Sequence, residues 1–185
     1  AEFRRALLRG HLTDAAVRRE ELARPPAGPP RAGAEPAAPS EIDAAVQVLL
    51  HGIGSVLAGD GLAGMKTLEP LTSDTQRNLS FRWLALYWSG RAATKIGSNA
   101  ARAHLKEALA LARRIDVAAL AATQWAAAEF LAQAGNAKEA LAFLGVARAG
   151  FERLGERWGL AQTWLAEARV HAAADREEDA AAAAR

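Results

Sequence analysis

Residues 130–141 read FLAQAGNAKEAL, a Gly-Asn break with helix-forming residues on both sides. Glycine adopts the left-handed backbone conformation that often ends a helix, and asparagine is a common turn residue. Small side chains stand around the break at Ala132, Ala134 and Ala140. The stretch therefore predicts two helices joined by a short turn, with small residues that let the two backbones approach closely.

The same break recurs along the chain at a nearly constant spacing. Gly59, Gly97 and Gly135 are evenly spaced, and the turn-forming residue Asp175 follows at almost the same interval. A small residue stands seven positions before each break: Gly52, Gly90, Ala128 and Ala168. Another stands about five positions after each break: Gly64, Ala101, Ala140 and Ala180. A period of about 40 residues predicts an array of four helix–turn–helix units.

Composition supports the helical interpretation and excludes several classes of function. Apolar residues make up 51% of the chain and charged residues 24%, and most of the apolar residues are Ala and Leu, which favour helix over sheet. The chain has no cysteine, which excludes disulfides and thiolate metal sites. With a net charge of +2, the chain is not expected to have the broad basic surface that binds nucleic acid. No apolar run is long enough for a bilayer crossing and no signal peptide is recognisable, so we expect no membrane partner and a cytoplasmic location.

The chain divides into three parts. Residues 1–23 predict an N-terminal helical segment, and residues 24–40 hold five of the seven prolines and predict a linker. Residues 41–185 form the predicted repeat domain. Its units span about 41–78, 79–116, 117–155 and 156–185. The absent initiating Met and the helix-forming end of the chain suggest a fragment of a longer protein.

The repeat resembles the tetratricopeptide repeat (TPR). That signature has a small residue at its eighth position, a large apolar residue at the eleventh, a turn near the fifteenth and Ala at the twentieth. The third unit matches with Ala128, Leu131, Gly135 and Ala140. The second unit matches with Leu86, Gly90, Gly97 and Ala101, but has Ala93 at the large position. The resemblance covers residues 41–185 and implies a right-handed α-solenoid of four hairpins.

The two outer units depart further from the signature. The fourth offers Trp164, Ala168 and Ala180, with His171 at the large position, where we expect it to pack between helices. The first has Gly52, Gly59 and Gly64, with Ser55 at the large position and Pro70 in its second helix. The period also exceeds the family's usual length of about 34 residues. Such degenerate arrays resemble those of large bacterial signalling ATPases and of LuxR-type transcription activators of the maltose-regulator kind.

The resemblance places a binding wall on the first helix of each unit, and solenoids use such concave surfaces to bind partners. The centre of this wall carries Tyr87, Arg91, Trp125, Glu129 and Arg169. Aromatic residues beside arginines suit a protein or peptide partner, because they anchor apolar side chains and pair with carboxylates or phosphates. The alternative is that Tyr87 and Trp125 fill the core, while Arg91 and Glu129 form an ordinary surface pair. Trp83, Trp88, Trp158 and Trp164 are expected to be core residues.

The wall of the first unit is entirely aliphatic. Its residues are Val46, Leu49, Ile53 and Val56. Uncovered, they would form an apolar contact patch. The N-terminal helical segment, another part of the parent protein or a second copy could cover it. Self-association through this patch is therefore an alternative function, as is the binding of a small effector molecule.

No motif in the sequence predicts catalysis, a cofactor or a metal. Residues 59–64 read GDGLAG, which satisfies G-x-G-x-x-G, but a helical unit precedes them where a nucleotide site needs a strand. The four histidines fall in different parts of the chain without zinc-ligand spacing. We therefore expect a non-enzymatic protein- or peptide-binding scaffold or sensor segment of a larger bacterial regulator.

Overall fold

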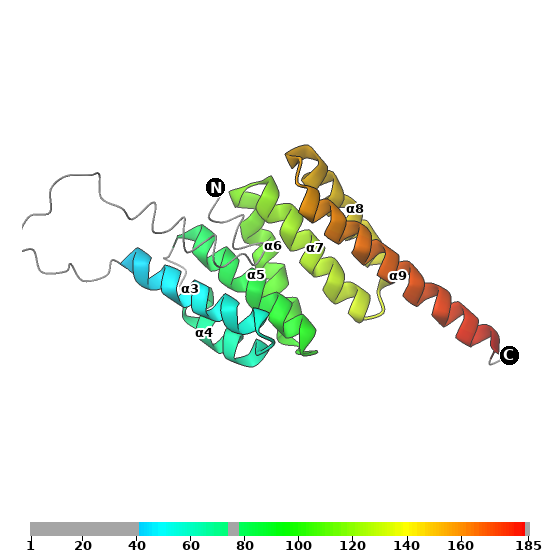
Figure 1. Ribbon diagram of the computed structural model, residues 1–185, viewed down its shortest axis with the longest axis horizontal. Coiled ribbons are helices and arrows are strands. Elements are labelled where there is room, and N and C mark those ends of the chain that lie inside the picture. The colour runs from blue at the N-terminus through cyan, green and yellow to red at the C-terminus, as the bar shows by residue number, and fades with distance from the viewer. Residues whose placement is uncertain (1–40, 74–77, 184–185) are drawn as a thin grey trace, which may run out of the picture.

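The structure is a computed structural model that describes residues 41–73 and 78–183 of the chain. Over these residues it contains seven α-helices and no strand, so the predicted all-α class is confirmed. The helices are α3 (Glu41–Leu57), α4 (Gly61–Ser73), α5 (Leu79–Lys95), α6 (Ala100–Ile115), α7 (Val117–Gln133), α8 (Ala137–Leu154) and α9 (Arg157–Ala183), as Figure 1 shows. The predicted segments at residues 1–23 and 24–40 lie outside the described residues.

The first three predicted units each hold one pair of helices that turns at a glycine. The φ angle is +95° at Gly59, +68° at Gly97 and +78° at Gly135. Residues with a Cβ are strained in this region, whereas glycine is not. The predicted turns at these three positions are confirmed. In the GDGLAG stretch Gly59 and Asp60 lie in the turn and residues 61–64 begin α4, where Asp60 accepts a hydrogen bond of 2.9 Å from the Ala63 backbone N–H.

The fourth predicted turn is wrong. Helix α9 runs without a break from Arg157 to Ala183 and passes through Asp175. The other three breaks contain a glycine, whereas Asp175 lies among alanines that favour helix, and a single Asp costs little in a helix interior. The consequences are local. Trp164 and His171, which we expected in the core or between helices, are exposed on α9.

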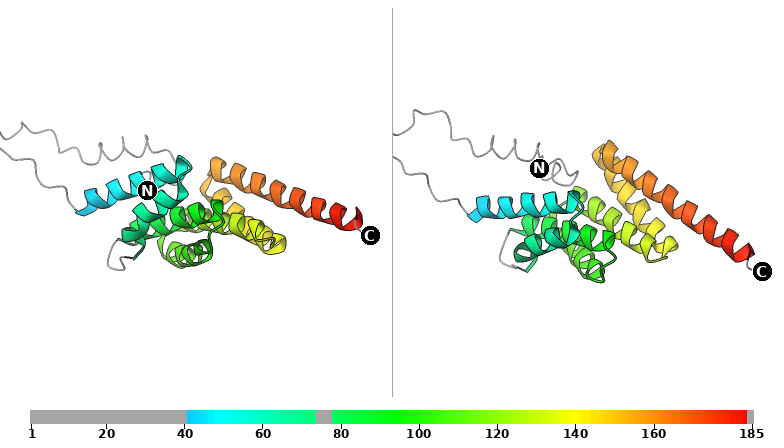
Figure 2. Two further views of the ribbon diagram at one scale, coloured as in Figure 1. Left: turned by 90° about the horizontal axis from the view of Figure 1, so that it is seen from below. Right: turned by 60° about the horizontal axis from the view of Figure 1, so that its bottom comes forward.

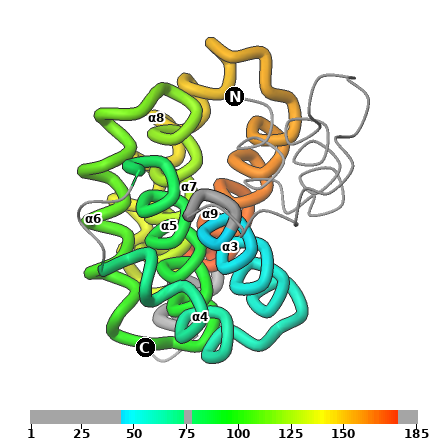
Figure 3. The backbone as a smooth tube through the Cα atoms, turned by 90° about the vertical axis from the view of Figure 1, so that its left-hand side faces the viewer, coloured from blue at the N-terminus to red at the C-terminus, as the bar shows by residue number. Residues whose placement is uncertain are grey.

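The helices pack in chain order. Each helix from α3 to α9 contacts the next, and α3, α5, α7 and α9 also contact one another in succession. Viewed along the long axis, α6 and α8 lie on one side and α3 and α9 on the other, with α5 and α7 between them (Figure 3). The first helices of the three hairpins and α9 therefore form one continuous row.

In the first three units the small residues of the repeat lie where paired helices touch. A Cβ at Gly64 in α4 would lie 2.4 Å from Val56 Cγ2 in α3, and one at Gly52 would lie 2.6 Å from Leu68 Cγ. A Cβ at Gly90 in α5 would lie 2.7 Å from Leu105 Cγ in α6. None of these distances leaves room for a larger side chain. The prediction that small residues allow close approach of the helices is confirmed for the first three units, whereas Ala168 of the fourth unit is exposed.

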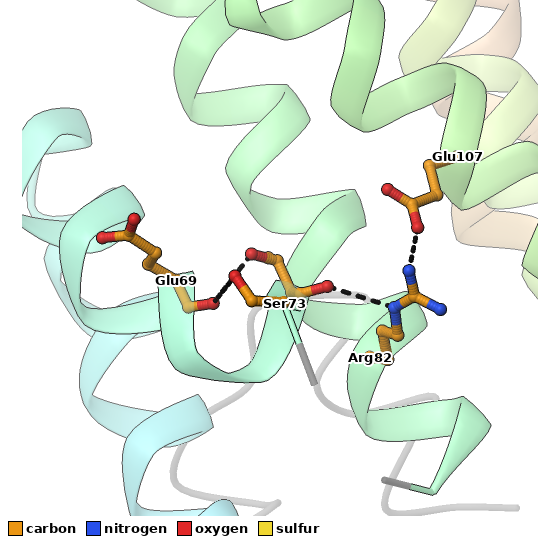
Figure 4. Close-up of polar contacts among 5 residues, drawn as sticks. Glu69, Ser73, Arg82 and Glu107 are labelled. Atoms are coloured by element: carbon orange, nitrogen blue, oxygen red, sulfur yellow. Dashed lines mark hydrogen bonds and ion pairs between the residues drawn. The ribbon is translucent and has the colours of Figure 1, made fainter. Parts of the chain in front are cut away.

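An arginine ties the second hairpin to the first. Arg82 of α5 donates from Nε to the Thr72 carbonyl oxygen at 3.1 Å, and its Nη2 pairs with Glu107 of α6. Figure 4 shows Arg82 reaching both the end of α4 and Glu107. The Ser73 hydroxyl donates to the Glu69 carbonyl in the same last turn of α4. Arg82 thus satisfies a terminal carbonyl, which a helix end otherwise leaves without a partner.

A candidate binding wall on α5, α7 and α9

Three charged residues occupy equivalent places on successive helices of the row. Arg91 lies on α5, Glu129 on α7 and Arg169 on α9. Arg91 Nε lies 4.0 Å from Glu129 Oε2, and the two side chains are 15% and 30% exposed. Arg169 is exposed and acts electrostatically on Glu129. The structure therefore brings these three predicted wall residues into one charged row.

Arg91 lies over an aromatic floor. Its guanidinium carbon is 4.6 Å from the ring centroid of Trp125, 4.9 Å from that of Trp88 and 5.7 Å from that of Tyr87. A cation over an aromatic face is attracted by the ring's negative face, by about 0.5–2 kcal/mol. Trp158 of α9 extends the floor, with its ring centroid 5.7 Å from that of Trp125. The rings hold the arginine head in place between α5 and α7.

The aromatic residues of the predicted wall lie under it rather than on it. Tyr87 and Trp125 are buried in the core, as are Trp83 and Trp88. Burial raises the pKa of the Tyr87 hydroxyl, and the neighbouring Arg91 charge opposes that rise. Because both side chains are covered, they fix Arg91 and offer a partner no free surface in this conformation. The sequence did not predict the part that Trp88 plays in this floor.

Several buried donors at the floor remain without a hydrogen bond in the described structure. They include the Tyr87 hydroxyl, Trp88 Nε1, Trp125 Nε1 and Arg91 Nε. Buried donors are normally paired, and leaving one unpaired costs about 1–3 kcal/mol. Glu129 Oε2 lies 4.0 Å from Arg91 Nε, which is beyond hydrogen-bond distance. Glu129 therefore leaves these donors at the floor without an acceptor.

Glu129 is a carboxylate among cations. Burial raises its pKa, while the charges of Arg91, Lys95 and Arg169 pull it back down. Three cations act on one carboxylate, so the surroundings carry a surplus of positive charge. Such a surface favours an anionic group on whatever binds to it.

A cavity of about 260 Å³ opens beside Glu129 and Arg169, between α7, α8 and α9. Small and aliphatic residues supply most of its wall, and Glu129, Gln133 and Arg169 supply the polar groups. The apolar lining residues are Ala128, Ala132, Gly135, Ala137, Leu144, Ala166, Val170, Ala173 and Ala174. Apart from Glu129 and Arg169, the sequence did not predict this lining as a site. The run of small residues facing each other from α7 and α9 was the available signal.

The aliphatic residues of the first unit are not a free surface. Val46, Leu49, Ile53 and Val56 are at most 6% exposed. Leu49, Ile53 and Val56 belong to the main hydrophobic core, and Val56 packs directly on Gly64 of α4. The proposed cover by the N-terminal segment lies outside the described residues. An apolar contact patch at these positions would first have to be uncovered.

Comparison with known proteins identifies no relative of this chain. No protein-family model matches it, and neither a curated protein nor a solved structure shows significant similarity to it. Within residues 41–73 and 78–183, no cluster of three or more His, Asp or Glu residues is arranged to hold a metal ion. None of the described helices combines the length and the apolarity that crossing a bilayer requires.

Proposed function

We propose that residues 41–183 form a TPR-like, right-handed α-solenoid that binds a protein or peptide on the row of helices α5, α7 and α9. Three features support this proposal. The helices pack in chain order, one constant interval separates the turn glycines, and small residues lie at the helix contacts. In this proposal the chain is a scaffold or sensor segment of a larger bacterial regulatory protein, and it recognises a partner without catalysing a reaction.

The observation that carries the proposal is the position of the apolar cavity next to the charged row. Glu129 and Arg169 belong both to the row and to the cavity wall. A partner could therefore place an aliphatic side chain in the cavity while an acidic group beside it pairs with Arg169 and Arg91. Charge-assisted pairs of this kind are stronger than neutral hydrogen bonds. We expect the partner to be a segment with an aliphatic residue next to Asp or Glu.

The size of the cavity favours a side chain over a complete small molecule. Pockets for drug-sized ligands usually measure about 300–1,000 Å³, and this cavity is smaller, at about 260 Å³. A single Leu, Ile or Val side chain fits such a volume. The small-effector alternative would need a compact aliphatic anion.

A selection from a random peptide library displayed on phage tests the proposal. The immobilised chain should enrich peptides that carry an aliphatic residue beside an acid. Titration of the selected peptide should then show weaker binding to Arg169→Glu, because the mutation reverses the charge at the cavity rim. Ala173→Trp should also weaken binding, since it places a large side chain in the cavity from an exposed position on α9.

Matched controls separate binding from folding. Ala110→Trp places the same large side chain on an exposed position of α6, away from the cavity, and should leave affinity unchanged. Arg169 is exposed, so Arg169→Glu should keep the melting temperature. Arg91 is a poorer probe, because it packs on three rings and its removal should also destabilise the fold. Selection without a consensus, or a peptide that binds both cavity variants normally, would refute the proposed site.

A further inference from the structure

One face of α9 lacks the cover that the corresponding faces of α5 and α7 have. Gly90 of α5 lies against Leu105 of α6, and Ala128 of α7 is buried. The residue at the same repeat position in α9 is Ala168, which is exposed. In both views of Figure 2, no other described helix lies over the side of α9 that faces away from α7 and α8. Helix α9 therefore exposes a face that its counterparts α5 and α7 bury.

The open face carries a large apolar residue and two opposite charges. Trp164 is 54% exposed, and Ala161, Ala168 and His171 are exposed beside it. Arg157 and Asp175 are exposed on the same face, near its two ends. With 3.6 residues per turn, all six positions lie within about 40° of one direction. Together they form the open face of α9, a stripe that includes neither Arg169 nor the lining of the cavity.

These residues are complementary to their own copy in one antiparallel register. A twofold axis at the level of residue 166 brings Trp164 of one chain beside Ala168 of the other, so that a large residue meets a small one. In the same register Arg157 meets Asp175, a cation against an anion. Ala161 meets His171, again small against large. Symmetry repeats every one of these pairs, as it does in any isologous interface.

We propose that a second copy of this chain docks on the open face, and that two α9 helices pair antiparallel about residue 166. The small residues allow close approach of the helices, and each Trp164 covers the partner's Ala168. Burial of two exposed tryptophans supplies the apolar centre, and the two pairs of Arg157 with Asp175 fix the direction and the register. The dimer leaves the cavity and the Arg91–Glu129–Arg169 row on a different side of α9.

Sedimentation equilibrium of the full chain measures this directly. The wild-type chain should show a reversible monomer–dimer equilibrium. Trp164→Asp should raise the dimer dissociation constant about 30-fold or more, since a central aromatic residue carries most of the energy of a small interface. The control is Leu62→Asp on α4, where Leu62 is 69% exposed and lies outside the open face. It should leave the equilibrium unchanged.

A charge reversal tests the register. Arg157→Asp alone and Asp175→Arg alone should each weaken the dimer about fivefold, because each places like charges opposite one another twice. The double variant restores opposite charges in the antiparallel pairing and should return the dissociation constant to that of the wild type. A parallel pairing would put Arg157 next to its own copy, and the double variant would not restore it.

Engineered cysteines locate the contact, because the chain has none of its own. A mixture of Ala161→Cys and His171→Cys chains should form the mixed disulfide on oxidation. Ala161→Cys alone should not, since residue 161 and its copy would lie about 15 Å apart along the axis. A wild-type chain that stays monomeric up to near-millimolar concentration overturns the inference. So does a dimer that Trp164→Asp leaves intact. Neither outcome bears on peptide binding at the cavity, which the Arg169→Glu variant tests separately.

Discussion

Helices α5 and α9 hold the same place in the repeat but lie in different surroundings. In α5 the residues from Trp83 to Gly90 are all buried, and Gly90 lies in contact with α6. In α9 the corresponding small residue, Ala168, is exposed, and the side chain of Trp164 is about half exposed. The difference arises because α5 folds back through Gly97, whereas α9 continues through Asp175. A repeat position is therefore buried by the helix that follows it, and the residue at that position does not decide the matter alone.

The largest expected difference between a helix inside a hairpin and α9 comes from truncating a leucine side chain in each. Leu144 of α8 is fully buried, whereas Leu165 of α9 is 46% exposed. Leu144→Ala should lower the free energy of unfolding by about 3 kcal/mol, because it removes buried contacts and enlarges the neighbouring cavity. Leu165→Ala should lower it by less than about 1 kcal/mol. Urea denaturation compares the two variants, and equal losses would mean that α9 is as enclosed as the hairpins.

A glycine pair tests the close approach inside the hairpins. Gly64→Ala places a Cβ 2.4 Å from Val56 Cγ2 and 2.9 Å from the Gly52 carbonyl oxygen, so it should cost about 2 kcal/mol through overpacking. Gly145 lies within α8, and a Cβ there meets nothing within 4 Å. Gly145→Ala should instead stabilise the fold by up to about 1 kcal/mol, because alanine is the better helix former. Thermal denaturation should give melting temperatures that move in opposite directions.

The turn between α7 and α8 has no counterpart in α9, and it can be tested at Gly135. Gly135 has φ +78° and open space around its Cα, so Gly135→Ala tests backbone conformation alone. The substitution should lower the free energy of unfolding by about 1–2 kcal/mol. Asp175→Gly offers the opposite change at the same repeat position in α9, and it should cost no more than about 0.5 kcal/mol. Chemical denaturation of both variants checks the order, which would be reversed if the chain also turned at residue 175.

The smallest expected effect is a dependence of folding stability on pH. It arises at Glu129 of α7, which lies in the charged row between Arg91 of α5 and Arg169 of α9. Burial raises the pKa of Glu129, so the folded chain holds this proton more tightly than the unfolded chain does. Stability should therefore fall as the pH rises from the ordinary carboxyl range through the raised pKa. Glu129→Gln removes this loss and should equal or exceed the melting temperature of the wild type at neutral pH. In acid, where the carboxyl is protonated in both states, the difference should vanish.

The exposed Glu139 of α8 supplies the control for that measurement, because Glu139→Gln removes one carboxylate without touching the wall. This variant should keep the fall in stability with rising pH that Glu129 causes. If Glu129→Gln were less stable than the wild type at neutral pH, the attraction to Arg91, Lys95 and Arg169 would outweigh the cost of burial. The row would then be a stabilising ion network.

Much of the fold could be predicted from the positions of a few small residues. The recurring glycines marked the three turns because only glycine adopts a positive φ without strain, and the small residues around them marked the helix contacts. The turn at Asp175 was wrongly predicted because aspartate is common in turns and is also tolerated in helices. Trp164 and His171 were misplaced for the same reason, since their burial depended on a helix that does not follow.

The candidate site was predictable only in part. The resemblance to the repeat placed Arg91, Glu129 and Arg169 on one wall, and in the structure their equivalent positions on successive helices lie side by side. It did not show that Tyr87 and Trp125 lie beneath Arg91, since a helix position near the edge of a face can point inward or outward depending on how the next helix tilts. The cavity was missed because it is an empty space between three helices, and no single residue encodes it.

The sequence by itself determined the helices and their three turns, because helix propensity and the freedom of glycine act within a few residues of the chain. The tertiary structure alone decided which aromatic rings are covered, how far Glu129 is removed from water and which face of α9 is left open. These properties depend on contacts between helices that are distant in sequence. Burial and the pKa shifts that accompany it exist only after those helices have packed together.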